Sequence, residues 1–497
     1  MLVLSTGLLA VPPALLLAAA PAGREVVVAE PTPVDTFDPI AHSNFNNWFA
    51  WQLAYETLVV VQPDGKIAPQ LATSWRTSPD GRTYTFMLRS GVKFHDGSPL
   101  TSADVVFSFE RLMAKGIPYA KDRFPNLASV KALDASTVQF QLKKQDSSFM
   151  NNLGDPFVVA GAILSRGATQ ATDPATKMIG TGPFKMVAYT PGTELVLERN
   201  VDYWRPGVPG VDRLVIRYIK EAQSAVAALL AGAVALIYPT PETYVALRRN
   251  ARVKLLSVAT ASTWQINMGS VKPPLDNVDV RRAIALSIDR AAVAKLALLG
   301  EGVPTSPFPP AHPWAVPLSQ QPYYQRDPAK AKQLLAQAGY PNGVDLTFMY
   351  PTLSETVRRI SEVLQSQFAE GGIRVKLEAL ETNVWLDKLV KANYDLTMTN
   401  PPYFSDPSLY IVPRRGRQGP TPRELQVLLD RAAEASYTQL LGLFKQIQVT
   451  EANLAYPFTG VVAENKWVAW RTHLVEGVTM DFTQSRRLYF TIRKPGP

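Results

Sequence analysis

Few residues of this chain could carry out catalysis. The histidine that stands directly beside a carboxylate is His95, next to Asp96. Imidazole and carboxylate together are the pair that many hydrolases use for general acid–base catalysis. Gly97 follows, which puts the pair in a predicted turn, and no G-x-S-x-G nucleophile motif occurs in the sequence. These residues predict a protein that is not an enzyme, and a secreted hydrolase is the alternative from another class.

Residue types that hold metals or redox cofactors are scarce as well. The chain contains no cysteine, which excludes disulfides, thiolate chemistry and cysteine-ligated metals. Its four histidines, His42, His95, His312 and His473, are far apart in sequence, and His42 near Asn44 is the one hint of a ligand group. The sequence therefore predicts no cofactor, while capture of a metal or metal chelate stays open as an alternative.

Length and charge describe an ordinary folded protein of several parts. The chain has 497 residues, which predicts two or three lobes, since one domain holds roughly 100–200 residues. Its net charge of +9 is dispersed, and the densest basic runs are arginine pairs. A nucleic-acid groove would need clustered charge with interleaved aromatic residues, so we expect no nucleic-acid partner.

The N-terminal segment predicts export. Residues 1–22 are largely apolar and end in small residues, as in a secretory signal peptide, while Pro12 and Pro13 interrupt the run. No charged side chain precedes Arg24, so we expect the true start of the signal to lie upstream of Met1. Without a lipobox cysteine, the mature protein is expected to be free in the periplasm, without a lipid anchor.

One stretch organises the middle of the chain. Gly180 and Gly182 flank a threonine and allow close backbone approach, and Pro183 fixes the exit into a strand. Residues 193–199 and 212–219 alternate largely as half-buried strands do, and a Pro/Gly-rich loop joins them. The pattern predicts a long two-strand unit with an aromatic corner of Tyr203 and Trp204.

The motifs GTGPF, RN and DYW, followed by a Gly/Pro turn and an alternating strand, resemble the signature of the dipeptide/oligopeptide/nickel-type solute-binding proteins of ABC importers (solute-binding protein family 5). Three further stretches follow the order of that family. They begin at Ile67 (IAPQLATSWRTSPDGRTYTF), at Trp264 (WQINMGSVKPPLDNVDVRRAIALSIDR) and at Arg326 (RDPAKAKQLLAQAGYPNGVDLTF). The resemblance therefore covers most of the chain.

The resemblance implies an α/β, two-lobed periplasmic-binding-protein fold of class II and cluster C, with an extra small domain on the first lobe. The implied segments are a signal peptide (1–22), the first lobe (23–45), the extra subdomain (46–178), the first lobe continued (179–265), the second lobe (266–474) and the return to the first lobe (475–497). Two crossings side by side would bend together and let the lobes close.

Strands alternating with helices over residues 340–400 predict a second lobe with a mainly parallel sheet and a cleft at the carboxyl ends of its strands. Peptide-binding relatives place an Asp three residues before an Asp-Pro pair, where it holds the amine of the peptide. Counting back from Asp406, this chain has Tyr403 there and Asn400 at the position of a preceding Trp. The predicted ligand contacts are Phe45, Trp264, Trp385, Tyr403, Phe404 and Arg414.

Two functions from different classes follow from these residues. The first is capture of a small solute, peptide-like or another small organic molecule, by closure of the lobes, with delivery to the transmembrane subunits of an ABC permease by a monomer. A ligand favours closure only through its higher affinity for the closed form. The second is the hydrolase named above, for which the sequence offers no nucleophile motif.

Overall fold

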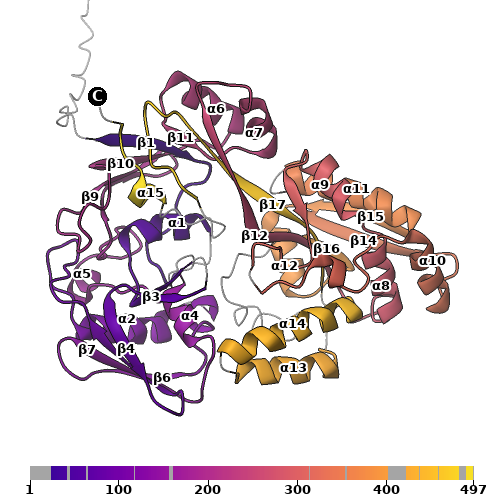
Figure 1. Cartoon of the computed structure of the whole chain (residues 1–497), viewed down its shortest axis with the longest axis horizontal. Helices are drawn as coiled ribbons and strands as arrows, with labels where there is room; N and C mark the ends of the chain where they lie inside the picture. Colours follow the sequence, from indigo (N-terminus) through magenta and orange to yellow (C-terminus); the bar gives the residue numbers. More distant parts are fainter. Residues whose placement is uncertain are drawn as a thin grey trace, which may run out of the picture.

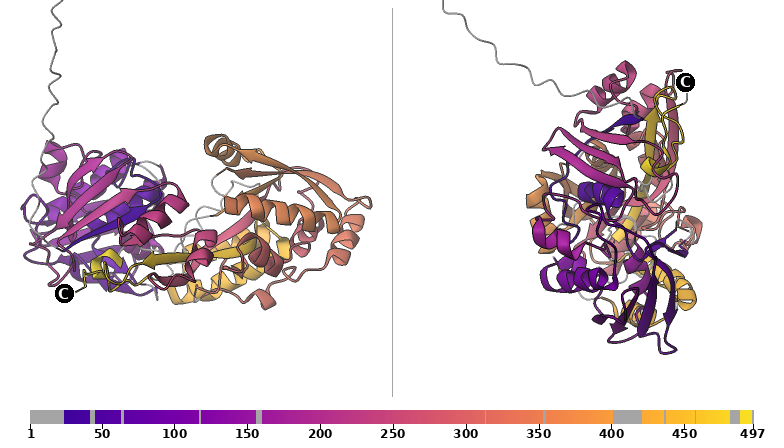
Figure 2. Two further views of the ribbon diagram at one scale, coloured as in Figure 1. Left: turned by 90° about the horizontal axis from the view of Figure 1, so that it is seen from above. Right: turned by 90° about the vertical axis from the view of Figure 1, so that its left-hand side faces the viewer.

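The structure is a computed structural model of the chain. It describes residues 24–41, 45–62, 65–116, 118–155, 160–312, 314–352, 355–400, 421–435, 437–456, 458–480 and 488–495. Figure 1 shows two lobes connected by two long strands, and Figure 2 shows them from two further sides. The predicted signal peptide lies outside the described residues. No helix in the described ranges is long and apolar enough to span a membrane.

One mixed sheet runs through both lobes. Its hydrogen-bonded order is β15-β14-β16-β12-β17-β11-β1-β10-β9-β8, and β13 pairs with β17 off this path. The strands on the side of the first lobe are β1 (Glu25–Glu30), β8 (Phe184–Thr190), β9 (Glu194–Arg199), β10 (Arg213–Tyr218) and β11 (Leu236–Ile237). Those of the second lobe are β13 (Gly302–Pro304), β14 (Val344–Pro351), β15 (Ile373–Leu380) and β16 (Leu396–Thr399).

Two long strands belong to both lobes. They are β12 (Lys254–Met268) and β17 (Phe458–Trp470), which pair antiparallel along most of their length. The register shifts between Ala259 and Thr263, and there the hydroxyl of Thr260 donates to the Glu464 carbonyl at 2.7 Å. A β-bulge bends a strand locally. We place the hinge between the lobes at this irregularity.

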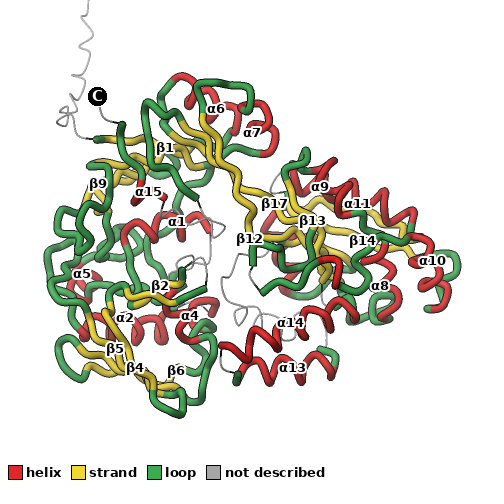
Figure 3. Tube along the Cα trace, viewed as in Figure 1, coloured by secondary structure: helices red, strands yellow, loops and turns green. Residues whose placement is uncertain are grey.

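Helices accompany the sheet in both lobes (Figure 3). Those of the first lobe and its small subdomain are α1 (Phe45–Ala54), α2 (Ser102–Lys115), α3 (Pro118–Lys121), α4 (Phe149–Gly154), α5 (Arg166–Ala171), α6 (Ala222–Ala231), α7 (Pro241–Leu247) and α15 (Leu488–Thr491). Those that follow β12 are α8 (Val278–Leu286), α9 (Arg290–Ala297), η1 (Leu318–Gln320), α10 (Pro328–Gln337), α11 (Glu355–Glu370), α12 (Thr382–Val390), α13 (Arg423–Ala433) and α14 (Tyr437–Leu454).

The small subdomain has its own four-stranded sheet. Its order is β4-β5-β7-β6, from β4 (Ala72–Thr77), β5 (Thr83–Leu88), β6 (Leu127–Ala132) and β7 (Thr137–Leu142), and a separate pair is formed by β2 (Val59–Val61) and β3 (Ile67–Pro69). Thr101 and Asp104 form the capping box at the start of α2, as the sequence predicts. Phe109 packs edge-on against Phe140 of the sheet, with ring centroids 4.8 Å apart.

The buried carboxylate of Glu56 holds the GTGPF and DYW motifs together. Glu56 is 3% exposed and accepts hydrogen bonds from Thr181 at 2.9 Å, Tyr203 at 2.9 Å, Trp204 at 3.0 Å and Gln70 at 3.1 Å. Burial raises the pKa of Glu56, and these donors offset part of that rise. Thr181 belongs to GTGPF, and Tyr203 and Trp204 belong to DYW. Both motifs therefore fold onto one side chain.

The predicted two-strand unit is present, and one predicted helix is divided. Strands β9 and β10 pair antiparallel, and β8 adds a third strand on the other side of β9. The sequence predicts a single helix over residues 279–290, which is wrong at its end. α8 stops at Leu286, and Asp289 accepts a hydrogen bond from the Ala292 amide, at 2.8 Å, as the cap of a new helix.

The lobe boundaries implied by the resemblance stay a proposal, and we place the return to the first lobe earlier than residue 475. Trp470 and Ala469 of β17 already pair with Leu236 and Ile237 of β11. Ala469 is also buried in an apolar cluster with Leu229 of α6. We therefore propose that the second crossing lies inside β17, opposite the bulge in β12.

Candidate functional site

Parallel strands of both lobes end at the hinge. In the first lobe, β1 runs parallel to β10 and β11, and β11 ends at Ile237, opposite Ala469 of β17. In the second lobe, β14 runs parallel to β15 and β16, and β16 ends at Thr399, opposite Gln265 of β12. Because β12 and β17 are the crossing strands, both carboxyl edges face the crossing. Such edges are where open α/β sheets bind ligands.

The edge of the first lobe carries a chain of hydrogen bonds. The hydroxyl of Tyr238 donates to Tyr489 at 2.9 Å, and the hydroxyl of Tyr489 donates to Glu30 at 2.9 Å. Glu30 ends β1, Tyr238 follows β11, and Tyr489 comes from α15 near the end of the chain. The return segment therefore contributes directly to this edge.

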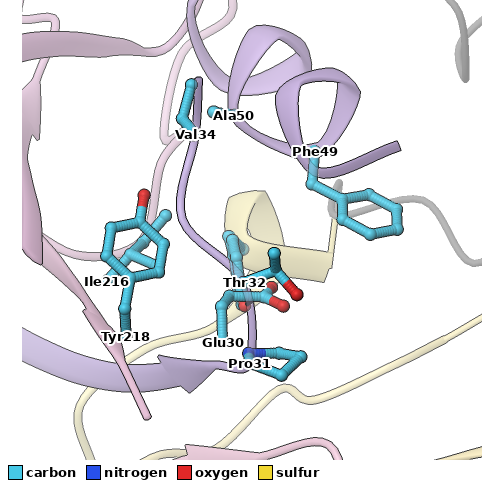
Figure 4. Close-up of a pocket in the computed structure, with 9 residues that line it drawn as sticks. Glu30, Pro31, Thr32, Val34, Phe49, Ala50, Ile216 and Tyr218 are labelled. Carbon is cyan, nitrogen blue, oxygen red and sulfur yellow. Dashed lines mark hydrogen bonds between the residues drawn. The ribbon is translucent and has the colours of Figure 1, made fainter. Parts of the chain in front are cut away.

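A small pocket opens beside this chain of hydrogen bonds. Its volume is about 50 Å³, and Glu30, Thr32, Phe49, Tyr218 and Tyr489 are among the residues that line it. Figure 4 shows Glu30 and Thr32 next to each other and the ring of Phe49 on the side of α1. A volume of this size holds a few water molecules rather than a solute. We expect a solute to lie across the edge, outside this pocket.

The strands of the second lobe that end at the hinge carry hydroxyl and amide side chains, of which Asn267 and Thr397 are buried and Ser262, Thr399 and Asn400 are partly exposed. The hydroxyl of Ser262 donates to Asn400 at 2.5 Å, and that of Thr399 donates to Asn267 at 3.0 Å. The indole N–H of Trp385 donates to the Thr397 hydroxyl at 2.9 Å. We call these six side chains the polar strip. Neutral donors and acceptors of this kind fix the orientation of a polar solute without requiring it to carry a charge.

The opposite face of the same strands is apolar and carries Trp264, one of the predicted ligand contacts. Trp264 is 6% exposed and belongs to the buried cluster of the second lobe, together with Ile266 and Met398. Side chains alternate between the two faces of a strand, so Trp264 points away from Gln265 and Asn267. Trp264 therefore packs in the core of the second lobe, and its role as a ligand contact remains a prediction.

Of the other predicted ligand contacts, the structure describes the side chain of Trp385 alone. Trp385 is partly buried in α12 and belongs to the polar strip through its hydrogen bond to Thr397. Phe45 is the first residue of α1, and its side chain is outside the described set. Tyr403, Phe404 and Arg414 lie outside the described residues. Their role as ligand contacts therefore remains a prediction.

His95 has a structural role that explains its position beside Asp96. Its Nε2 lies 3.0 Å from the Gly182 carbonyl, and its Nδ1 accepts from the Gly180 amide at 3.3 Å. Burial lowers the pKa of His95 to about 4, so the ring is neutral at pH 7. Both ring nitrogens are thus engaged with the backbone of GTGPF, which leaves neither to act as a general base.

The described ranges hold no group of three or more His, Asp or Glu side chains placed to bind a metal ion. His42, the residue on which the metal alternative depends, lies outside those ranges. Metal capture therefore has no support from the described side chains.

Two ion pairs join the lobes beside the hinge. Arg248, at the end of α7, pairs with Glu301, which precedes β13, and Glu242 of α7 pairs with Arg359 of α11. The side chain of Glu301 is 9% exposed, and it also accepts from the Trp467 indole at 3.4 Å. Glu301 is therefore a buried carboxylate that ties α7 to the crossing strand β17.

Replacing Glu301 by glutamine should loosen this connection. Hydrogen bonds to charged groups contribute about 1.5–3 kcal/mol, and an amide keeps only part of that, so we expect the free energy of unfolding to fall by about 1–2 kcal/mol. Urea titration measures the change. The control is Glu362→Gln on α11, whose pair with Arg358 is exposed and should cost less than about 0.5 kcal/mol. Equal losses in the two variants would contradict the role of Glu301.

Two lobes that share one sheet, cross twice at neighbouring strands and present parallel-strand edges to the crossing define a two-lobed periplasmic-binding-protein fold. Residues 66–418 match the model of the Bacterial extracellular solute-binding proteins, family 5 Middle. The chain belongs to this family of extracellular solute-binding proteins, which serve ABC importers.

Individual relatives support the same assignment. The chain is 30% identical to the glutathione-binding protein GsiB of Escherichia coli (strain K12) over 373 residues, 74% of this chain and 72% of the relative. It is 30% identical to di/tripeptide-binding protein 1 of Pseudomonas aeruginosa (strain UCBPP-PA14) over 392 residues, 72% of each. The binding protein DppA of Helicobacter pylori, solved with the peptide STSA, superposes with a TM-score of 0.81 at 26% identity, covering 95% of this chain and 98% of that one. The predicted family and fold are confirmed.

Sequence reasoning missed most of the residues that the structure brings together here. Glu30, Tyr238 and Tyr489 come from three distant segments, and none stands in a recognisable motif. Two of them could have been found by one rule, because Glu30 and Tyr238 stand at the ends of strands that precede loops of the predicted first lobe. Tyr489 carries no such signal.

Proposed function

We propose that this protein captures a small, polar organic solute between the carboxyl edges of its two lobes and delivers it to the transmembrane subunits of an ABC importer. The observation that carries the proposal is that parallel-strand edges of both lobes face one hinge, with the polar strip on one side. We further propose that it acts in the periplasm as a monomer and catalyses no reaction.

A peptide-like solute is the first candidate. GsiB of Escherichia coli is a glutathione-binding protein, and protein 1 of Pseudomonas aeruginosa is a di/tripeptide-binding protein. The polar strip supports such a solute, since amide and hydroxyl side chains such as Asn400 and Ser262 pair well with peptide groups.

The experiment that tests this function starts from gently purified protein. Native mass spectrometry identifies any solute that it retains, and titration of that solute or of glutathione into stripped protein is followed by tryptophan fluorescence. We expect saturable binding and recovery of the added compound unchanged. Conversion of the compound would favour the hydrolase alternative. Retention of a metal ion or chelate would favour the metal alternative, and absence of any bound small molecule would contradict solute capture.

Simple dipeptides should bind poorly to the unaltered protein. Tyr403 stands where peptide-binding relatives have the Asp that holds the charged amine, and a charge-assisted hydrogen bond contributes about 1.5–3 kcal/mol. Calorimetry with Ala-Ala should therefore show affinity that is roughly ten-fold or more higher in the variant Tyr403→Asp. N-acetyl-Ala-Ala, which lacks the amine, is the control and should gain nothing. Strong binding of Ala-Ala to the unaltered protein would contradict this assignment.

A further inference from the structure

The α13–α14 hairpin is fixed to the second lobe at one end. The guanidinium of Arg281 on α8 donates to the Leu454 carbonyl at 3.2 Å, and that of Arg282 donates to the Asn453 carbonyl at 2.8 Å. Leu454 and Asn453 are in the last turn of α14. Two charged donors on two carbonyls at a helix C-terminus make a firm attachment.

Side chains in the middle of α14 strengthen this attachment. Phe444 packs edge-on against Phe308 and Trp314, with ring centroids 5.2 Å and 5.0 Å away. The side chain of Gln448 accepts from the Val316 amide at 2.9 Å and donates to the Trp314 carbonyl at 3.1 Å. The loop that precedes η1 is therefore attached to the hairpin.

The other end of the hairpin reaches the small subdomain of the first lobe. Glu434, which follows α13, pairs with Lys144 after β7 at 3.5 Å. Ala435 is 7% exposed and lines a groove of about 590 Å³ together with Tyr84 and Met150 of the subdomain. Figure 1 shows this corner of α13 and α14 beside α4. The hairpin thus spans the distance between the lobes.

Apolar side chains also connect the hairpin to the small subdomain. Leu429, Ala435 and Phe444 of the hairpin belong to one continuous buried cluster with Phe140 and Phe149 of the subdomain. The sheet of the second lobe has a separate cluster. α14 has 18 residues, a length of about 27 Å at 1.5 Å per residue, so it can act as a rigid spacer.

We propose that the α13–α14 hairpin is a strut that holds the lobes together at a third place, opposite the hinge, before any solute binds. The ion pair at the tip of the strut is weak. Lys144 and Glu434 are 57% and 69% exposed, so the pair is screened by solvent, and the groove beside Ala435 leaves the junction only partly filled. The ion pair can therefore form and break readily, while the shared apolar cluster adds to the contact.

The strut has a consequence for affinity. When only part of the population is competent to bind, the apparent dissociation constant is the intrinsic one divided by that fraction. A contact that favours the closed arrangement raises the fraction and therefore the affinity, without touching the solute. We expect removal of the Lys144–Glu434 pair to weaken binding about two- to five-fold, in keeping with an exposed ion pair.

Cross-linking tests the strut without a solute. Because the chain has no cysteine, the variant Lys144→Cys/Glu434→Cys offers two thiols and no others. With a short bis-maleimide, stripped protein should cross-link efficiently. The matched control is Lys144→Cys/Glu424→Cys, because Glu424 is exposed on the same helix and lies ten residues, about 15 Å, away along it. Equal yields, or no cross-link in the first variant, would overturn the proposal whatever the cleft binds.

Charge exchange gives a second, independent readout. Glu434→Lys should increase the radius of gyration measured by small-angle scattering, because two positive charges then meet at the tip of the strut. The double variant Lys144→Glu/Glu434→Lys restores an opposite-charge pair and should restore the compact value. A single variant that scatters like the unaltered protein, or a double variant that stays expanded, would contradict the strut.

Discussion

Replacing Gly180 by alanine is expected to destabilise the first lobe by about 3 kcal/mol, because a Cβ at this position would lie 2.0 Å from the Ala54 carbonyl oxygen and 2.8 Å from the ring of Tyr55. Neither the Ala54 carbonyl nor the backbone around Gly180 can move easily. The Gly182 amide donates to the same carbonyl at 2.9 Å, and Thr181 is held by Glu56. The clash therefore falls on backbone that is fixed from both sides.

Urea denaturation measures this loss as a lower unfolding midpoint. Gly167→Ala in α5 is the control, since nothing lies within 4 Å of a Cβ at that position. Alanine is favoured over glycine in helices, so the control should be unchanged or up to about 1 kcal/mol more stable. Similar losses in both variants would mean that the packing of GTGPF over α1 is not as described.

The protein is also expected to lose stability in mild acid through His95. Its pKa falls from the ordinary value of 6.5 to about 4 on folding, so the unfolded chain binds more protons between these values. Stability from this group is therefore complete above pH 6.5 and is lost as the pH falls towards 4. The loss is at most about 3 kcal/mol, at 1.36 kcal/mol per pKa unit. A charged ring would also direct an N–H at the Gly180 amide.

Urea titrations between pH 7 and pH 4 test this dependence. His95→Gln cannot titrate in this range and should show a flatter profile than the unaltered protein, whatever its absolute stability. His473→Gln is the matched control for the loss of a histidine, because the side chain of His473 is exposed. An unchanged slope in the His95 variant would show that another group is responsible for the acid sensitivity.

Periodicity in the sequence was sufficient to predict most elements near the central motif and in the second lobe. Ala331, Leu334 and Leu335 are buried in α10 as their spacing predicts, and β14 and β15 are parallel. Trp264 could not be placed in the same way, because the residues on both sides of it in β12 are buried. When both faces of a strand are covered, alternation no longer tells which face is core.

The candidate site was less accessible to prediction than the fold. Glu30 and Tyr489 are separated by 459 residues and meet only because the chain returns to the first lobe. The Glu56 cluster illustrates the opposite case, since GTGPF and DYW are visible as motifs while the carboxylate that unites them is not. Residue type and spacing identify partners within one element, but not those that only the topology brings together.

The central position of β17 also bears on how the chain matures. This strand lies near the C-terminus, yet it pairs with β11, β12 and β13, and Val461 and Val462 are buried in the second lobe. The shared sheet is therefore complete only when strands that are far apart in the sequence have paired. Contacts over such long sequence separations form slowly.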